Sequence, residues 1–564
     1  MAISITDDTL ALQRLYHWER TAPDRVALTQ PIGGGAVRDY TWREVAEQAR
    51  RMAAHLQTLA LPPGSCIAIL SKNTAHWLMA DFAIWIAGHV SVPLYPTLAS
   101  ATIRQILEHS QSRLLFVGKL DTWPAQQGGV PAGLPCITLP LAPKAAADSG
   151  YPRWDEVVAH TPPLAGQRLR AGAELATIMY TSGTTGAPKG VMHSFATFAW
   201  SLTSGLKRVT SIGESTRMLS YLPLSHVAER TLVEHGQLAA GFHVYFAESL
   251  DTFTADLQRA RPTVFFSVPR LWVKFQQGVA AKMPLKKLDR LLSVPILRGI
   301  VAKKILGALG LQDCQFAAGG AAPMPPELLR WYARLGLDLV EVYGMTENCG
   351  ISHATLPGRP RPGTVGLPYE GVSCRVDPGN GEIQFKSPGL MLGYYKEPEL
   401  TKRVLTEDGW LRTGDKGTID GEGYLRITGR VTDLFKTSKG KYVAPAPIED
   451  RLVMHPALEA CCVTGASLGQ PIGLVMLNAA AAAQAAAPAG RSEIEASLAA
   501  HLKAINEPLD PHEQLDCLVA MAEPWSVDND LITPTFKVKR SRIEERFAKG
   551  YGGWVAQRKP VVWA

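Results

Sequence analysis

Apolar runs and amphipathic stretches alternate along the first part of the chain. Apolar positions that recur every three to four residues indicate helices, and short continuous apolar runs indicate buried strands. The pattern predicts, in chain order, a helix, a strand, two helices and a strand over residues 40–52, 66–70, 73–88, 102–109 and 113–117. Strands that alternate with helices are typical of an α/β layered domain.

The alternation resumes after a glycine-rich stretch near residue 185. The apolar run 175–180 comes directly before that stretch, and the runs 264–269, 315–320 and 337–343 each predict a strand that ends in a Gly-rich or polar turn. Ligands of open α/β sheets bind beyond the carboxyl ends of the strands. These strand ends are therefore candidates for one shared site.

The character of the chain changes twice more. Residues 361–424 show short strands separated by Gly turns, which predicts a small β-rich subdomain, and a further change follows Arg430. A chain of 564 residues also exceeds the usual size of a single core. We expect a large layered α/β N-terminal domain with a β-rich subdomain over residues 1–429, and a small α+β C-terminal lid over residues 430–564.

Three stretches carry weaker local signals. Residues 119–172 are rich in Pro, Gly and Ala and predict an irregular excursion. Residues 479–490 are almost all alanine, which suggests a low-complexity loop or a weak helix. Ser492 and Glu495 have the spacing of a capping box, so we expect a helix to open there and run toward Ile505.

Composition and charge narrow the class of protein. A formal net charge of +7 is small for this length, and the basic residues are scattered, which argues against a nucleic-acid partner. A weak attraction to anionic ligands or membrane surfaces stays open. The eight cysteines show no CxxC spacing, and the adjacent Cys461 and Cys462 lie in an apolar run, which predicts reduced, buried thiols.

The sequence shows no secretory or membrane-spanning pattern. Residues 1–8 lack the basic region and apolar core of a signal peptide. The longest apolar segment, 78–88, contains Asp81 and is too short to cross a bilayer. We expect a cytoplasmic protein, with peripheral contact at the inner face of the membrane and a homodimer left open.

The stretch 181–190 carries the first chemical signal. It holds three glycines, four hydroxyl side chains and one lysine, and it directly follows a predicted strand. Glycines let backbone N–H groups approach a ligand, hydroxyls add donors and the lysine adds charge, so the stretch suits a polyphosphate. Its spacing differs from a Walker A loop. The residues expected to hold phosphate are Thr181, Ser182, Gly183, Thr184, Thr185, Gly186 and Lys189.

This stretch resembles the phosphate loop of the adenylate-forming superfamily, which includes acyl-CoA synthetases, luciferases and peptide-synthetase adenylation domains. The sequence Tyr-Gly-Met-Thr-Glu at 343–347 resembles a second motif of that family. A base can stack on Tyr343 beside Gly344, Thr346 can bond a phosphate oxygen, and Glu347 can hold Mg²⁺, which prefers few carboxylates plus phosphate oxygens. Thr181 is the second expected Mg²⁺ ligand. Gly320 and Ala321 lie in a stretch that resembles the adenine-side loop.

Three later motifs follow in the order of the family. The resemblance implies that Asp415, in Thr-Gly-Asp, binds the ribose hydroxyls, that Arg430 lies near the ribose and that Lys436 lies near the phosphates. Thr432 departs from the family, which usually places Asp or Lys at this hinge position, so a salt bridge that fixes the hinge is in doubt. Near the C-terminus, Lys537 corresponds to the lysine that bridges the substrate carboxylate and the α-phosphate.

The implied activity is ATP-dependent activation of a long- or medium-chain fatty acid and its transfer to CoA, with Mg²⁺ as the cofactor. The stretch 221–230 resembles the long-chain subgroup, and its His226 could line the acyl or thiol channel. The lid is expected to be mobile and to rotate between the two half-reactions. Three alternatives stay open: a ligase for an aromatic or branched acid, an enzyme that loads a carrier protein, and a non-catalytic nucleotide-binding regulator.

Overall fold

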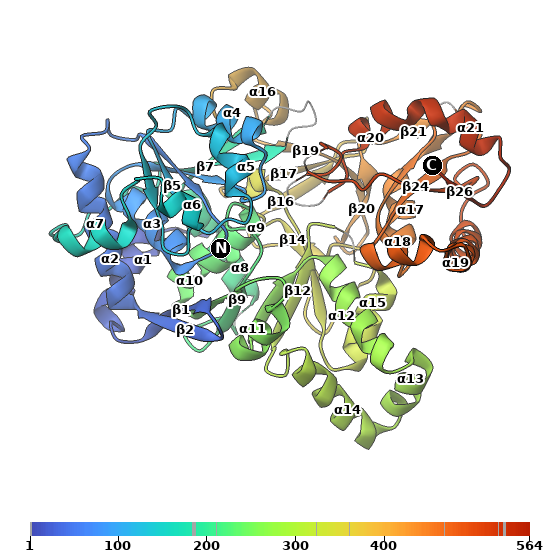
Figure 1. Ribbon diagram of the computed structural model, residues 1–564, viewed down its shortest axis with the longest axis horizontal. Coiled ribbons are helices and arrows are strands. Elements are labelled where there is room, and N and C mark those ends of the chain that lie inside the picture. Colours follow the sequence, from blue (N-terminus) through green and yellow to red (C-terminus); the bar gives the residue numbers. More distant parts are fainter. Residues whose placement is uncertain are drawn as a thin grey trace.

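A computed structural model describes residues 3–182, 188–209, 211–322, 324–359, 361–466, 468–527, 529–533 and 537–564, and the side chains of Ser182 and Leu285 are not included. The part before residue 431 contains four sheets flanked by helices, and the part after it forms a smaller body at one side (Figure 1). The predicted α/β class with a large and a small part is confirmed.

The largest sheet carries the end of the glycine-rich stretch. It is parallel at its centre, and β8 returns antiparallel to β7. Its strands, in spatial order, are β18 (Gly393–Tyr394), β8 (Pro188–Ser194), β7 (Leu175–Ser182), β4 (Val90–Leu94), β3 (Cys66–Leu70), β5 (Leu114–Val117) and β6 (Cys136–Thr138).

Helices formed by the predicted patterns cover this sheet. Thr41 and Glu44 form a capping box at the start of α2 (Trp42–Thr58), and every residue of the apolar α3 (Ala75–Ile86) is buried. Nearby helices are α1 (Ala11–Thr21), α4 (Ser100–Ser110) and α8 (Phe195–Arg208). The excursion 119–172 is largely irregular but contributes β6 and short helices, among them α5 (Trp123–Gln126), α6 (Lys144–Ala147) and α7 (Trp154–His160).

A second sheet brings the other predicted strand ends toward the same region. Its first three strands are parallel, and its spatial order is β11 (Val264–Ser267), β12 (Phe316–Gly320), β13 (Leu339–Tyr343), β14 (His353–Ala354) and β15 (Leu367–Pro368). A third sheet comprises β2 (Ala36–Thr41), β1 (Val26–Gly33), β10 (His243–Phe246) and β9 (Arg217–Ser220). The helices after β10 are α11 (Phe253–Ala260), α12 (Pro269–Lys282), α13 (Leu285–Ser293), α14 (Pro295–Ala308) and α15 (Pro326–Arg334).

The predicted β-rich subdomain is a four-stranded antiparallel sheet. It comprises β16 (Ser373–Val376), β17 (Glu382–Lys386), β19 (Leu411–Ile419) and β20 (Leu425–Arg430). The short helix α16 (Pro398–Val404) lies between β18 and β19 in the chain.

The C-terminal body has its own sheet and core. After the hairpin of β21 (Phe435–Lys436) and β22 (Tyr442–Val443), its sheet has the order β23 (Leu458–Thr464), β24 (Ile472–Leu477), β25 (Leu518–Ala520) and β26 (Val561–Trp563). Its helices are α17 (Pro445–Leu452), α18 (Ala479–Ala485), α19 (Pro488–Asn506), α20 (Arg540–Phe547) and α21 (Tyr551–Val555). Cys461 and Cys462 lie in β23 as buried free thiols, as expected.

Helices α18 and α19 test the predictions for residues 479–490 and for the capping box at Ser492. The alanine-rich stretch does form a helix, α18, capped by the Asn478 side chain, which accepts from the Ala481 N–H at 3.0 Å. The prediction that a capping box at Ser492 opens the helix is wrong. The helix starts at Pro488, whose fixed φ suits the first turn, and the Ser492 hydroxyl donates back to the Pro488 carbonyl at 3.1 Å.

A charged cluster lies inside the N-terminal part. Arg230 begins the π-helix η3 (Arg230–His235), and its side chain, like those of Asp81 and Glu234, is fully buried. The guanidinium pairs with the Asp81 carboxylate, and its Nε lies 3.2 Å from Glu234 Oε2. Burial, followed by the nearby charge of Asp81, raises the pKa of the Glu234 carboxyl well above its usual value, which favours its neutral form. The Arg230 guanidinium compensates the buried charge of Asp81.

One ion pair joins the two parts of the chain. Arg270, in the first turn of α12, pairs with Glu459 of β23, and both side chains are partly buried. Among the described residues, no helix combines the length and the apolarity that crossing a bilayer requires.

Candidate active site

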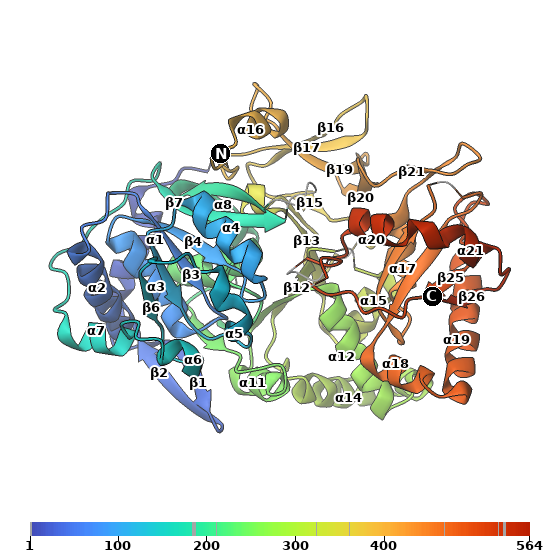
Figure 2. The same cartoon turned by 45° about the horizontal axis from the view of Figure 1, so that its top comes forward.

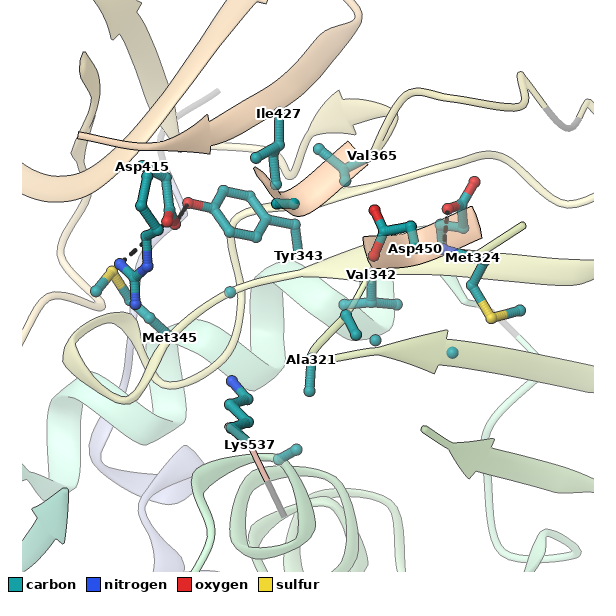
Figure 3. A pocket seen from close by; sticks show the side chains of 18 of the residues that line it. Ala321, Met324, Val342, Tyr343, Met345, Val365, Asp415, Ile427, Asp450 and Lys537 are labelled. Atoms are coloured by element: carbon teal, nitrogen blue, oxygen red, sulfur yellow. Dashed lines mark hydrogen bonds and ion pairs between the residues drawn. The ribbon is translucent and has the colours of Figure 1, made fainter. Parts of the chain in front are cut away.

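A cavity of about 1100 Å³ lies where the two parts of the chain meet. Its walls come from the ends of β12 and β13, the β19–β20 hairpin, α17 and the segment around Lys537. Figure 3 shows Tyr343, Asp415 and Lys537 among the side chains that face this space. Three separate predicted motifs therefore meet in one cavity.

Tyr343, Asp415 and Arg430 form one polar group. The register of the β19–β20 hairpin places Asp415 directly opposite Arg430, and the guanidinium lies 3.0 Å from Asp415 Oδ1. The Tyr343 hydroxyl donates to Asp415 Oδ2. Burial, reinforced by the negative charge of Asp415, raises the pKa of Tyr343 well above its ordinary value, so the phenol stays protonated. A carboxylate has about four acceptor sites, so Asp415 can still accept from two hydroxyls of a ligand.

Glu347 is a buried carboxylate at the wall of the same cavity. Its Oε1 accepts from the Tyr394 hydroxyl at 2.7 Å. The neighbouring Thr346 also lines the cavity, and its carbonyl accepts from His193 Nε2 at 2.7 Å. Burial lowers the pKa of His193 to about 4, so this histidine is neutral near pH 7 and holds the 343–347 turn in place. Gly344 is required there, because a Cβ would lie 2.3 Å from the Gly350 backbone.

The adenine-side loop is tightly constrained. A Cβ on Gly320 would lie 2.7 Å from the Val342 carbonyl oxygen, so only glycine fits beside β13. Ala321 has a left-handed backbone with φ of 67°, which costs on the order of 1–2 kcal/mol for a residue with a Cβ. Both residues line the cavity. Strain of this kind persists where the surrounding structure holds a loop in one shape.

The ends of the phosphate loop are placed by the β7–β8 hairpin. Thr181 and Lys189 are directly opposite each other across the two strands, and Thr181 lines the cavity. The Lys189 ammonium lies 5.7 Å from the centre of the Tyr394 ring, so one tyrosine contacts both this loop end and Glu347. The predicted residues Gly183, Thr184, Thr185 and Gly186 lie outside the described part of the chain, as does the side chain of Ser182.

Lys537 enters the cavity from the C-terminal body. Its backbone N–H donates to Thr533 Oγ1 at 3.0 Å, and its carbonyl accepts from the Thr533 N–H at 2.7 Å, which fixes the start of its side chain. The side chain is exposed to the cavity, but the surrounding walls displace water and lower the pKa of its ammonium. The charge of Arg430 lowers this pKa further, whereas Asp415 and Glu347 oppose the shift.

His226 faces the same space. It caps the short helix α9 (Val227–Glu229), where its Nδ1 accepts from the Ala228 N–H at 3.2 Å. Burial, followed by the nearby charge of Lys537, lowers the pKa of His226 to about 4. The ring is therefore neutral near pH 7 and cannot supply a positive charge to a substrate.

Comparison with known proteins identifies the family. The model of the AMP-binding enzyme family matches residues 15–395, and the model of the AMP-binding enzyme C-terminal domain matches residues 432–550. This chain belongs to the AMP-binding enzyme family. The resemblance drawn from the motifs is thus confirmed.

Relatives of this AMP-binding enzyme share its fold but carry different names. It is 28% identical to the long-chain-fatty-acid–CoA ligase FadD15 of Mycobacterium bovis, over 95% of each chain. Its structure is similar to the adenylation domain of a carboxylate reductase from Mycobacterium chelonae, with 24% identity, a TM-score of 0.80 and coverage of 97% and 91%. It is also similar to the anthranilate CoA ligase AuaEII in complex with anthranoyl-AMP, with 21% identity, a TM-score of 0.75 and coverage of 95% and 97%. The named ligase supports adenylate-forming acyl-CoA ligase activity.

Three predicted residues of this AMP-binding enzyme are not among the described residues that line the cavity, namely Lys436, Thr432 and Lys189, which contacts Tyr394 from β8. Lys436 is exposed on β21, with its ammonium 5.6 Å from the centre of the Tyr442 ring, and it is not among the described residues that line the cavity. The Thr432 hydroxyl lies 3.2 Å from Oδ1 of its chain neighbour Asp433. In the observed arrangement, these residues do not line the cavity together with Asp415 and Lys537.

The donor set fits a magnesium ion that a nucleotide brings with it. The described residues contain no group of three or more His, Cys, Asp or Glu side chains that could hold a metal alone. Glu347 and Thr181 do line the cavity, and Mg²⁺ commonly uses one or two carboxylates together with phosphate oxygens and water. The residues present therefore fit a phosphate-bound Mg²⁺.

Sequence patterns did not reveal Tyr394, which supports the cavity wall through Glu347, or two carboxyls that line the cavity. Tyr394 contacts both Glu347 and Lys189 from the two-residue strand β18, which is too short for a periodic signal. Glu341 and Asp450 line the cavity, and burial raises the pKa of these carboxyls to about 8 and about 7. Glu341 lies inside a predicted strand, where an acidic residue within an apolar run was the one available signal.

Proposed function

We propose that this AMP-binding enzyme activates a long- or medium-chain fatty acid with ATP and then transfers the acyl group to CoA. In the first step the carboxylate attacks the α-phosphorus, which gives acyl-adenylate and pyrophosphate. In the second step the CoA thiolate attacks the mixed anhydride, which releases AMP and the thioester. The observation that carries the proposal is the meeting of Lys537 with Asp415, Tyr343 and Glu347 in one cavity.

The nucleotide is proposed to lie along one wall of this cavity. Its base would lie between Tyr343 and the loop of Gly320 and Ala321, and its ribose hydroxyls would bond Asp415, with Arg430 nearby. The phosphates would lie toward Thr346, Thr181 and Lys189. Bound Mg²⁺ would neutralise phosphate charge, and Glu347 and Thr181 are the residues proposed to hold it.

Lys537 is proposed to act where two anions must meet. A carboxylate that approaches a phosphate is repelled, so a fixed cation between them stabilises the transition state more than the separated reactants. The cavity walls displace water around Lys537, which strengthens its electrostatic effect on a bound anion. His226, which is neutral, is proposed to shape the acyl or thiol channel.

The C-terminal body is proposed to be a mobile lid with its boundary at residues 429 and 430. In the observed arrangement Lys537 points into the cavity, which suits adenylate formation (Figure 3). Rotation about the hinge near Thr432 would withdraw Lys537 and bring the segment near Gly440 to the CoA channel. Thr432 has no ion pair that fixes one orientation among the residues the structure describes.

The test is pyrophosphate release from ATP and Mg²⁺ with straight-chain acids from acetate to about twenty carbons, a span on the order of one bilayer leaflet. Release that peaks with long chains, together with AMP and thioester once CoA is added, is the expected result. Release without thioester formation would favour a carrier protein as the acceptor. Pyrophosphate release only with aromatic or branched acids would show that these acids, and not fatty acids, are the substrates. No release with any acid would favour the non-catalytic nucleotide-binding regulator.

A further inference from the structure

The helical hairpin of α13 and α14 projects from the rest of the molecule. It lies at the lower edge of the molecule in both Figure 1 and Figure 2, away from the cavity. Leu288, Leu292 and Ala302 anchor it, because these buried residues belong to the core around Trp272. The hairpin is thus a fixed part of the fold.

The tip of this hairpin exposes aliphatic side chains. Ile296 is 80% exposed and Ile300 is 63% exposed, and Val294 and Leu297 beside them are also exposed. Of the fourteen large hydrophobic residues exposed in the described part of the chain, these four fall within seven consecutive positions. Isolated exposed aliphatic residues are common on soluble proteins, but a contiguous group marks an interaction surface.

The α13–α14 hairpin is strongly basic. Residues 282–304 contain seven Lys or Arg and one acidic residue, Asp289, whereas the whole chain has a net charge of only +7. Asp289 is paired with Arg334 of α15, so its charge does not offset the lysines. All seven basic residues are exposed, namely Lys282, Lys286, Lys287, Arg290, Arg298, Lys303 and Lys304, and the Arg298 guanidinium donates to the Ala333 and Arg334 carbonyls.

The apolar and basic groups are ordered along the helix axis. Ile296, Ile300, Lys303 and Lys304 follow one another at helical spacing, so they share one side of α14. Seven residues separate Ile296 from Lys303, which corresponds to about 10 Å along the axis. Interfacial segments bury apolar side chains about 5–10 Å into the boundary between headgroups and acyl chains and keep Lys and Arg on their polar side. An axial offset of this size lets the tip of the hairpin reach that depth while the lysines stay among the headgroups.

We propose that the α13–α14 hairpin docks this protein on an anionic bilayer surface. The aliphatic tip enters the headgroup region, and the exposed basic residues of the hairpin contact the negatively charged lipids. A second copy of this chain is a poorer partner for the hairpin, because the basic residues of the two hairpins would repel each other. The contact uses no residue of the cavity, so it is independent of the proposed reaction.

The experiment is sedimentation of the full chain with vesicles made of equal parts phosphatidylcholine and phosphatidylglycerol, and with vesicles of phosphatidylcholine alone. Ile296→Ser with Ile300→Ser should weaken partitioning onto the anionic vesicles at least about ten-fold, because two exposed aliphatic side chains no longer enter the lipid. The matched control is Leu250→Ser, since Leu250 is 94% exposed but lies outside the hairpin. This control should bind like the unmodified protein.

Charge is tested separately. Lys303→Glu with Lys304→Glu should weaken partitioning by roughly five-fold or more for each lysine lost, since a basic residue near an anionic membrane contributes about that factor. The same two changes at Lys503 and Lys549, which are exposed in the C-terminal body, should have little effect. Thermal unfolding of each variant should match that of the unmodified protein.

Two results would overturn the proposal. One is vesicle binding that the hairpin variants and their controls share equally, or that is missing altogether. The other is a concentration-dependent dimer, seen by sedimentation velocity without vesicles, that Ile296→Ser with Ile300→Ser abolishes while vesicle binding is unchanged. Because the assay needs neither ATP nor turnover, failure of the proposed ligase reaction would leave its outcome unaffected.

Discussion

Replacement of Lys537 by alanine should separate the two proposed half-reactions. The ammonium faces the cavity, where desolvation and then the charge of Arg430 lower its pKa and the carboxylates of Asp415 and Glu347 oppose that shift. At a separation of 4 Å and an effective dielectric constant of about 20, one unit charge contributes about 4 kcal/mol to a neighbouring anion. Loss of a single fixed donor from such a site typically slows the chemical step about 10²–10³-fold.

We therefore expect Lys537→Ala to slow adenylate formation by about 10²–10³-fold, measured as single-turnover pyrophosphate release. Thioester formation from supplied acyl-adenylate and CoA should retain much of its rate, because the lysine is proposed to leave the cavity for that step. Lys539→Ala is the matched control. Lys539 is two residues away and lines the same cavity, but its charge is paired with Asp530.

The pH dependence gives a second readout. Lys537 acts as a cation, and its pKa lies below the ordinary value of 10.5. Adenylate formation should consequently fall as the pH rises through this lowered pKa, whereas the thioester step from supplied adenylate should show no such fall from this group. Equal loss of both half-reactions in Lys537→Ala would refute the assignment.

Three further changes have expected outcomes. Asp415→Asn removes the anionic acceptor between Tyr343 and Arg430, and should weaken ATP binding about ten-fold or more by equilibrium titration, with acyl-acid binding unchanged. Arg230→Met leaves Asp81 and Glu234 buried without their cation, and should lower the free energy of unfolding by about 3–5 kcal/mol in denaturant titrations. His76 is buried and its pKa is lowered to about 3, so the unfolded chain takes up a proton below pH 6.5 while the folded chain does not. Between pH 7.5 and 4.5 this histidine should cost about 3 kcal/mol of stability, and His76→Phe should remove that share of the acid sensitivity.

Controls sharpen two of these expectations. Arg104→Met breaks an exposed ion pair with Glu108 at 3.6 Å and should change the free energy of unfolding by less than about 1 kcal/mol. A similar loss of stability in both arginine variants would contradict the claim that Arg230 compensates buried carboxyls. For His76, urea unfolding at both pH values is the measurement. An unchanged difference in the phenylalanine variant would show that other groups carry the acid sensitivity.

Local signals predicted the elements best. Helix α2 follows from apolar positions at helical spacing and strand β3 from a continuous apolar run, and both patterns depend only on neighbouring residues. The start of α19 was misplaced, because both Pro488 and Ser492 can open a helix and the sequence offers no measure of which one wins. In the excursion 119–172, β6 joins the parallel sheet through its pairing with β5, which is a long-range contact that no local pattern encodes.

For the candidate site too, local motifs could be predicted from the sequence and long-range contacts could not. Motifs identified Tyr343, Asp415, Arg430 and Lys537, and the structure places all four around one cavity. The contact of Tyr394 with Glu347 could not be predicted, because 47 residues separate them and β18 has only two residues. Lys436 shows the opposite limit, since a motif marked this residue but it is not among the described residues that line the cavity in the observed arrangement.

The ion pair between Arg270 and Glu459 has a consequence for how the surroundings act on this enzyme. It joins the first turn of α12 to β23, so the proposed rotation of the C-terminal body would have to separate it. Both side chains are partly exposed, and charges at a surface are screened over about 8 Å at physiological ionic strength. Added salt should therefore favour the open arrangement over the closed one. Ionic strength would act on this protein as a conformational effector, slowing the step that needs the lid closed and assisting the step that needs it turned.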